Sequence, residues 1–173
     1  MVELKGQLTI QYLASFIFFI GLIVYIYFAY SANLPAFVEE VRKEDVRSKA
    51  FQLSEVLLND PGDPANWGSG IGPDRIGLSD ENSNKTNLIS KSKVDELGVI
   101  CSNFDDVQQK LALYKPFSIY VFEIDQTTGD RGTPLVECVP PDFPKTTINA
   151  TIKRITVLNE SGDLKLAELI VQM

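Results

Sequence analysis

One uninterrupted apolar segment limits what this chain can fold into. Residues 13–30 carry no charged side chain and are rich in aromatic and β-branched types. As a helix rising about 1.5 Å per residue the segment is about 27 Å long, close to the ~30 Å hydrocarbon core of a bilayer. A helix that is apolar on every side has to lie in lipid, in a protein core or against copies of itself. The rest of the chain is therefore expected to be tethered.

Two ordinary interpretations of this segment are a signal anchor and a removable secretory signal. In the second, Ala29, Tyr30 and Ser31 would supply the small-residue cleavage site, and the mature chain would begin at Ala32. The segment is longer than the usual apolar region of a removable signal, which favours retention.

A third interpretation comes from the residues just before the segment. A short polar leader ends in Lys5 and Gly6, and Gln7, Thr9 and the pair Gln11-Tyr12 precede the long apolar run. This order resembles the class III signal of archaeal type IV pilin-like proteins. The resemblance implies a prepilin peptidase that cuts after Gly6, a mature chain that begins at Gln7, and an apolar helix that is kept. It also implies a leader of residues 1–6, a hydrophobic and stalk helix of residues 7–58, and an extracytoplasmic head of residues 59–173.

The same resemblance indicates how the helix would assemble. The family usually has Glu where this chain has Gln11, and that carboxylate attracts the amino terminus of a neighbouring subunit, so the amide here lacks the charge pairing. Assembly would also involve a secretion ATPase and a membrane platform. The candidate residues for the helix core lie just before the apolar segment and within it: Gln11, Tyr12, Phe16, Phe19, Gly21 and Ile23.

Composition narrows the functional classes. The formal net charge is −7 and histidine is absent, which argues against nucleic-acid binding and removes His-based catalytic or metal sites. No paired nucleophile and base, phosphate-binding glycine loop or cofactor motif is present, so we expect no enzymatic activity, no cofactor and no metal. The acidic residues Asp60, Asp63, Asp74, Asp80 and Glu81 do not follow the alternate-residue spacing of a calcium loop.

Other features predict that the C-terminal part lies outside the cytoplasm. Asn84, Asn149 and Asn159 each begin a glycosylation acceptor pattern. Cys101 and Cys138 fit no zinc spacing and are either a disulfide or two buried thiols.

Hydrophobic spacing predicts an α+β fold: a long N-terminal hydrophobic helix continues into a stalk helix, packed on a small antiparallel sheet with two short helices. Pro35 is expected to kink or interrupt the first helix. A second helical stretch, residues 36–58, has Val46, Ala50, Leu53 and Leu57 on one face, as a core-packed helix would. A turn-rich segment then carries a lone Trp67, expected to plug the loop onto the domain, with Ile71, Ile76 and Leu78 as its anchors. One pattern here also looks like a segment of the exterior domains of archaeal pilin-like proteins: Leu57-Leu58, then Pro61-Gly62, Pro64 and Trp67, then Ile76-Gly77-Leu78.

The short elements are predicted from caps and alternation. A helix over residues 91–97 ends at Gly98, and a capping box of Ser102 and Asp105 opens a second helix with Phe104, Val107 and Leu111 on one face. Residues 117–124 form a central strand, 135–139 a short strand, and 148–157 a strand with a bulge near Lys153 and Arg154. A turn at residues 160–163 leads to the last strand, residues 164–171.

Two functions remain open at this stage. The first is a structural subunit of an archaeal type IV pilus-like surface filament, with the apolar helix packed against copies of itself or other pilins and lipid around it before assembly. The second is an extracytoplasmic binding or accessory module that stays anchored in the membrane and does not polymerise.

Overall fold

The chain divides into two compact units, Met1–Arg42 and Lys43–Met173, which are described separately. The computed structural model describes residues 3–81, 85–141, 143 and 150–173, with side chains from Ile10 onward. The element order is one long helix, a 3-10 turn, a short strand, two short helices and four strands. The predicted α+β class is confirmed.

The long helix α1 spans Glu3–Asn59 and contains Pro35 in its interior. The predicted interruption of the helix at Pro35 is therefore wrong, while the alternative of a kink there stays a prediction. Proline removes one backbone donor, but its φ is compatible with a helix, and the long helical runs on both sides outweigh the local cost of about 3 kcal/mol. Two residues before Pro35, the Asn33 side chain donates a hydrogen bond to the Ala29 carbonyl, at 2.7 Å.

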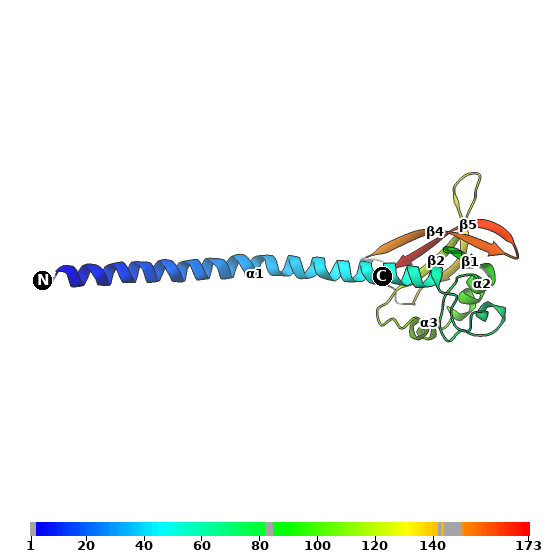
Figure 1. The fold of residues 1–173 in the computed structure, drawn as a ribbon, viewed down its shortest axis with the longest axis horizontal. Coiled ribbons are helices and arrows are strands. Elements are labelled where there is room, and N and C mark those ends of the chain that lie inside the picture. The colour runs from blue at the N-terminus through cyan, green and yellow to red at the C-terminus, as the bar shows by residue number, and fades with distance from the viewer. Residues whose placement is uncertain (1–2, 82–84, 142, 144–149) are drawn as a thin grey trace. The chain divides into compact units, whose positions relative to one another are not determined.

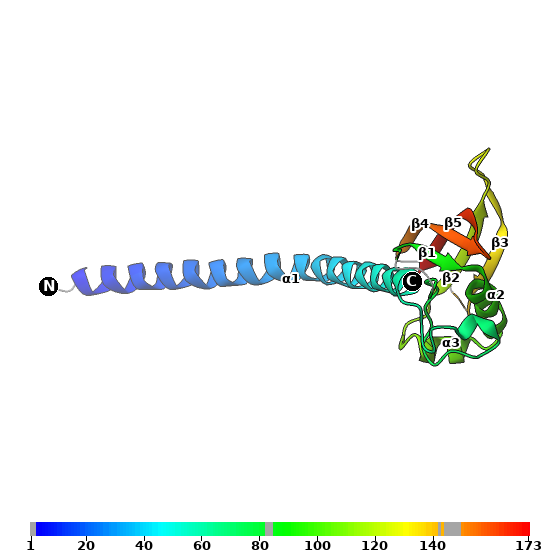
Figure 2. The same cartoon turned by 45° about the vertical axis from the view of Figure 1, so that its right-hand side comes forward.

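The second unit is a five-stranded sheet with helices on one face (Figures 1 and 2). Its strands are β1 Leu88–Ser90, β2 Ser118–Ile124, β3 Arg131–Cys138, β4 Thr151–Glu160 and β5 Asp163–Gln172. The spatial order is β1-β4-β5-β2-β3, and every pairing is antiparallel except that of β1 with β4. The middle strand is therefore β5, while β2, predicted to be central, lies between β5 and β3.

The predicted bulge in β4 is wrong. Strand β4 pairs residue for residue with β5, from Thr151 opposite Gln172 to Glu160 opposite Asp163. The apolar parity changes because Arg154 takes an inner-face position: its guanidinium pairs with Glu55 at 2.6 Å and lies 5.2 Å from the centre of the Phe51 ring. Ile155 is consequently on the outer face and exposed. Register shifts lie instead between β2 and β3 near Phe122, and β3 begins at Arg131, earlier than expected.

The β4–β5 turn lies where it was predicted, whereas the ends of the two short helices differ from the prediction. Ser161 and Gly162 have φ of 55° and 98°, the left-handed pair that a tight hairpin requires. Helix α2, Lys91–Ile100, passes through Gly98, which was predicted to end it. Helix α3, Phe104–Lys110, follows Asn103 with no side-chain cap, so the predicted capping box is not formed.

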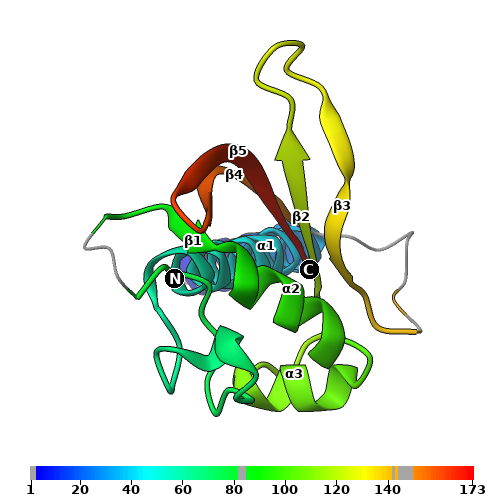
Figure 3. The same ribbon diagram turned by 90° about the vertical axis from the view of Figure 1, so that its right-hand side faces the viewer.

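The core of the second unit joins the last turns of α1 to the inner face of the sheet. Val46, Ala50, Leu53 and Leu57 are buried, as their spacing predicted. In Figure 3 the sheet curves around this end of α1, with α2 and α3 below it. Phe104 and Phe117 extend the same core, with ring centres 4.8 Å apart.

Candidate functional site

The apolar part of α1 is the first candidate site. Among the described residues, one helix is long and apolar enough to cross a membrane, and no part of its apolar window is buried. Large apolar side chains from Ile10 to Tyr30 are exposed all round the helix, and Leu34, Phe37, Val38 and Val41 are exposed beyond them on one side. Such a surface is unfavourable in water, which suggests that this segment is a membrane anchor or a signal.

The predicted assembly residues fall on different sides of this helix. Tyr12, Phe16, Phe19 and Ile23 are three or four residues apart and so share one face, whereas Gln11 and Gly21 do not lie on it. All the side chains of this set are exposed, and a Cβ at Gly21 would meet nothing within 4 Å. Lys5, Gly6 and Gln7 lie within α1, and their side chains are outside the described part. The peptidase cleavage stays a prediction.

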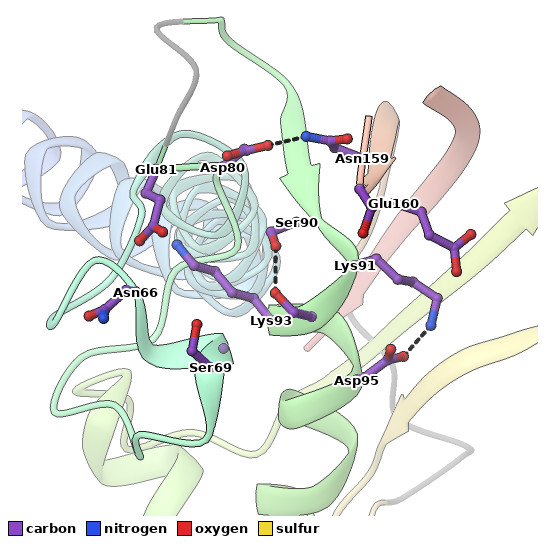
Figure 4. Close-up of a pocket in the computed structure, with 13 residues that line it drawn as sticks. Asn66, Ser69, Asp80, Glu81, Ser90, Lys91, Lys93, Asp95, Asn159 and Glu160 are labelled. Carbon is purple, nitrogen blue, oxygen red and sulfur yellow. Dashed lines mark hydrogen bonds and ion pairs between the residues drawn. The ribbon is translucent and has the colours of Figure 1, made fainter. Parts of the chain in front are cut away.

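The second candidate is a polar hollow in the head of about 380 Å³ (Figure 4). It is bounded by the 3-10 turn Trp67–Ser69, the start of α2 and the β4–β5 turn. Lys93 lies at its base with only 2 % of its surface exposed. The Lys93 ammonium donates hydrogen bonds to the carbonyls of Pro61 and Ser79, both at 2.8 Å.

The environment of Lys93 has opposing effects on its pKa. Burial disfavours the charged ammonium and lowers the pKa, while the nearby carboxylates of Glu81, Asp80 and Asp60 act in the opposite direction. The net shift is downward. Hydrogen bonds to backbone carbonyls thus stabilise the buried Lys93 ammonium and compensate for its lost hydration.

Trp67 and Lys93 donate hydrogen bonds to the same acceptor, the Pro61 carbonyl. Trp67 is fully buried, and its indole N–H donates to the carbonyls of Gly77 at 2.9 Å and Pro61 at 3.1 Å. The predicted plugging role of Trp67 is confirmed. Ile76 and Leu78 are buried as expected, but Ile71 is exposed, so it is not an anchor. Gly68 permits this packing, since a Cβ there would lie 2.7 Å from the Lys93 backbone nitrogen.

The polar groups that line the hollow are largely engaged with one another. Asn159 donates to the Asp80 carboxylate and accepts from the Gly162 amide at 2.8 Å, and Lys91 pairs with Asp95. Among the described residues no group of three or more His, Cys, Asp or Glu could hold a metal. The arrangement fits a structural clasp that ties the loop of residues 60–80 to α2 and the hairpin.

Of the three predicted glycosylation residues, Asn159 lies in the part of the chain that the structure describes. Asn84 and Asn149 lie outside the described residues. The Asn159 amide nitrogen, the atom to which a glycan would be attached, is the one that donates to Asp80. Glycan occupancy at these positions stays a prediction.

The two cysteines form a disulfide between the end of α2 and the end of β3. Cys101 and Cys138 are 37 residues apart in sequence, and their Cα atoms are 5.3 Å apart. Disulfides persist in oxidising compartments, so this bond suggests that the head lies outside the cytoplasm.

Sequence reasoning missed two features. Nothing in the sequence indicates that Lys93 is buried, because a lysine in a short helix is usually exposed to solvent. The exposed apolar residues Leu34, Phe37 and Val41 did give one, since their spacing of three and four places them on one helical face beyond the membrane-length segment.

No protein-family model, characterised protein or solved structure matches this chain. In the architecture of this chain, a long N-terminal apolar helix is followed by a small, disulfide-bonded, mixed β-sheet domain. That architecture is pilin-like.

Proposed function

We propose that the protein is a structural subunit of a surface filament of the archaeal type IV pilus kind. The observation that supports this most is α1, which exposes apolar side chains on every side from Ile10 to Tyr30. In this proposal the chain is inserted in the membrane, cut after Gly6 by a prepilin peptidase, and then packed through α1 against copies of itself. The head is displayed outside.

A single helix can serve as both anchor and filament core because the two environments are chemically alike. Lipid tails are as apolar as the side chains of a neighbouring helix, so close packing can replace lipid contact at little hydrophobic cost. The proposal includes a dedicated ATPase and a membrane platform to drive extraction. It needs no catalytic group, cofactor or nucleic acid.

The second candidate is an anchored module that binds or supports another envelope protein without polymerising. Gln11 favours this candidate, because an amide in place of the carboxylate that the family carries cannot form a charge pair with a neighbouring amino terminus.

Mass spectrometry of the natural product separates the candidates. A filament subunit is expected in sheared extracellular material with its amino terminus at Gln7, and a Gly6→Leu variant should keep the leader and leave the cells without these filaments. Recovery of the Gln7 form only from detergent-solubilised membranes would favour the anchored module. A soluble product that begins at Ala32 would contradict both.

A further inference from the structure

The sheet of the head splits at one end. Strand β2 pairs with β5 only as far as Glu123, which lies opposite Ala167. Ile124 pairs with Arg131 of β3 but with no residue of β5. Beyond this point the β2–β3 hairpin and the β4–β5 hairpin diverge, as Figure 3 shows. Residues 163–166 of β5 therefore pair with β4 on one side and with none of the described strands on the other.

The open edge of β5 carries unpaired backbone groups. In an antiparallel pair, successive residues point their N–H and C=O alternately toward the partner strand and away from it. Val157 lies opposite Leu166, and its N–H donates to the Asn87 carbonyl at 2.9 Å, away from β5. The backbone groups of Leu166, and by the same alternation those of Leu164, therefore point away from β4, toward the β2–β3 hairpin. Unpaired groups of this kind can accept a further strand.

A hollow of about 770 Å³ lies between the two hairpins, and we call it the hairpin notch. It is lined by residues 123–126, 128, 130–133 and 135 of the first hairpin and by residues 163–165 of the second. Ile124, Leu135 and Leu164 are its apolar side chains, and Leu164 is 51 % exposed. The notch thus combines an open strand edge with apolar side chains beside it, which are the two features by which a sheet binds an extended peptide.

Charge restricts which peptide fits the notch. Four carboxylates and two cations line it: Glu123, Asp125, Asp130 and Asp163 with Arg131 and Lys165. The two cations already pair with Glu168 and Glu160, which lie outside this lining. Asp130 and Asp163 are exposed and form no ion pair with any residue that the structure describes. A strand that carries lysine or arginine is therefore attracted, and an acidic strand is repelled.

We propose that the hairpin notch binds an extended segment of a partner protein in which apolar residues alternate with lysine or arginine. The segment adds a strand along residues 163–166 of β5 through backbone hydrogen bonds. Successive side chains of a strand point to opposite faces of the sheet, so one set reaches Leu164 and the other reaches the side of Asp163. This binding depends on the head and not on filament formation.

Fluorescence polarisation with the full-length protein in detergent tests this binding. The probe is a labelled peptide of three Lys-Val repeats, which the wild type should bind. The same peptide N-methylated at every residue keeps its charge and side chains but donates no backbone hydrogen bond, so it should bind at least about tenfold more weakly.

Charge reversal on the protein tests the second half of the proposal. Asp163→Lys should weaken binding of the Lys-Val probe by at least about fivefold, because it replaces an attraction by a repulsion. Asp105→Lys is the matched control, since it changes the net charge equally at an exposed position of α3, outside the notch. Figures 1 and 3 place α3 on the side of the head away from the tip of the β2–β3 hairpin, so this variant should bind the probe like the wild type.

A proline tests the backbone edge directly. Leu164→Pro removes an N–H that points into the notch and that pairing with β4 does not use, so it should weaken binding more than Leu164→Ala does. The emission of Trp67 reports whether the variant is folded. If it is not, the N-methylated probe still decides, because it leaves the protein unchanged.

Four results would overturn the proposal. They are no measurable binding of the Lys-Val probe, equal binding of its N-methylated form, an equal loss of affinity in Asp105→Lys, and tighter binding of a probe of three Glu-Val repeats. Probe binding that weakens as the protein is concentrated would assign the notch to a second copy of this chain and would equally reject a basic partner segment.

Discussion

Lys93 and Trp67 share one acceptor, the Pro61 carbonyl, and together hold the loop of residues 60–80 against α2. Replacing Lys93 by Met removes both ammonium hydrogen bonds and leaves the Pro61 and Ser79 carbonyls with fewer donors. The free energy of unfolding should fall by about 1–3 kcal/mol. Urea unfolding of the full-length protein in detergent, followed by the emission of its single tryptophan, measures the change.

Lys91→Met is the matched control for this substitution. Lys91 is two residues away on the same helix and pairs with Asp95, whose side chain is 55 % exposed. An exposed ion pair contributes roughly 0–1 kcal/mol, so the Lys91 variant should stay close to the wild type. Equal losses of unfolding free energy in the two variants would mean that Lys93 does not specifically hold the loop of residues 60–80 against α2.

The lowered pKa of Lys93 predicts how the same comparison depends on pH. Between that lowered pKa and the ordinary value of 10.5, the unfolded chain holds more protons at this position than the folded chain. Stability from this group therefore rises with pH across that interval. The advantage of the wild type over Lys93→Met should grow as the pH is raised from neutral toward 10.5, and a constant difference would show that the folded pKa is not lowered.

Single residues also show where sequence reasoning succeeds and where it stops. Trp67 was predictable, since a large aromatic among turn residues has few other places to go than the core. The position of Arg154 was not, because its partners Glu55 and Phe51 come from α1, about a hundred residues earlier in the chain. A contact between residues so far apart along the chain leaves no local pattern in the sequence.

At the scale of elements, the disulfide joins α2 to β3, which also contact each other directly. Closing a loop of 37 residues reduces the entropy of the unfolded chain, and the chain-entropy model gives about 4 kcal/mol for this length. The double variant Cys101→Ala with Cys138→Ala should lose stability of that order in urea unfolding. Added reductant should destabilise the wild type and leave the double variant unchanged; equal effects on both would contradict the prediction.

The types of the main elements were more predictable than their ends. Local runs and spacings of apolar residues place α1, β2, β4 and β5, because the apolar pattern depends on which faces are buried. The residues at which a helix or strand begins and ends depend on tertiary contacts. Gly98 stays inside α2, where a Cβ would be 3.8 Å from Val136, and α3 begins without the expected cap. The polar hollow combines the 3-10 turn, α2 and the hairpin, so only the fold could reveal it.

At the scale of the whole molecule, the apolar helix and the disulfide together predict on which side of the membrane the head lies. A chain anchored by α1 with its head outside should have Cys101 and Cys138 fully oxidised, since reducing compartments keep thiols free. Denaturing intact cells directly into a thiol-reactive polyethylene glycol should give no mass shift, and prior reduction should give a shift of two adducts. A variant that lacks residues 1–34 supplies the comparison, because it stays in the cytoplasm and should react without prior reduction. Two reactive thiols in the anchored chain would place the head inside and contradict the filament proposal.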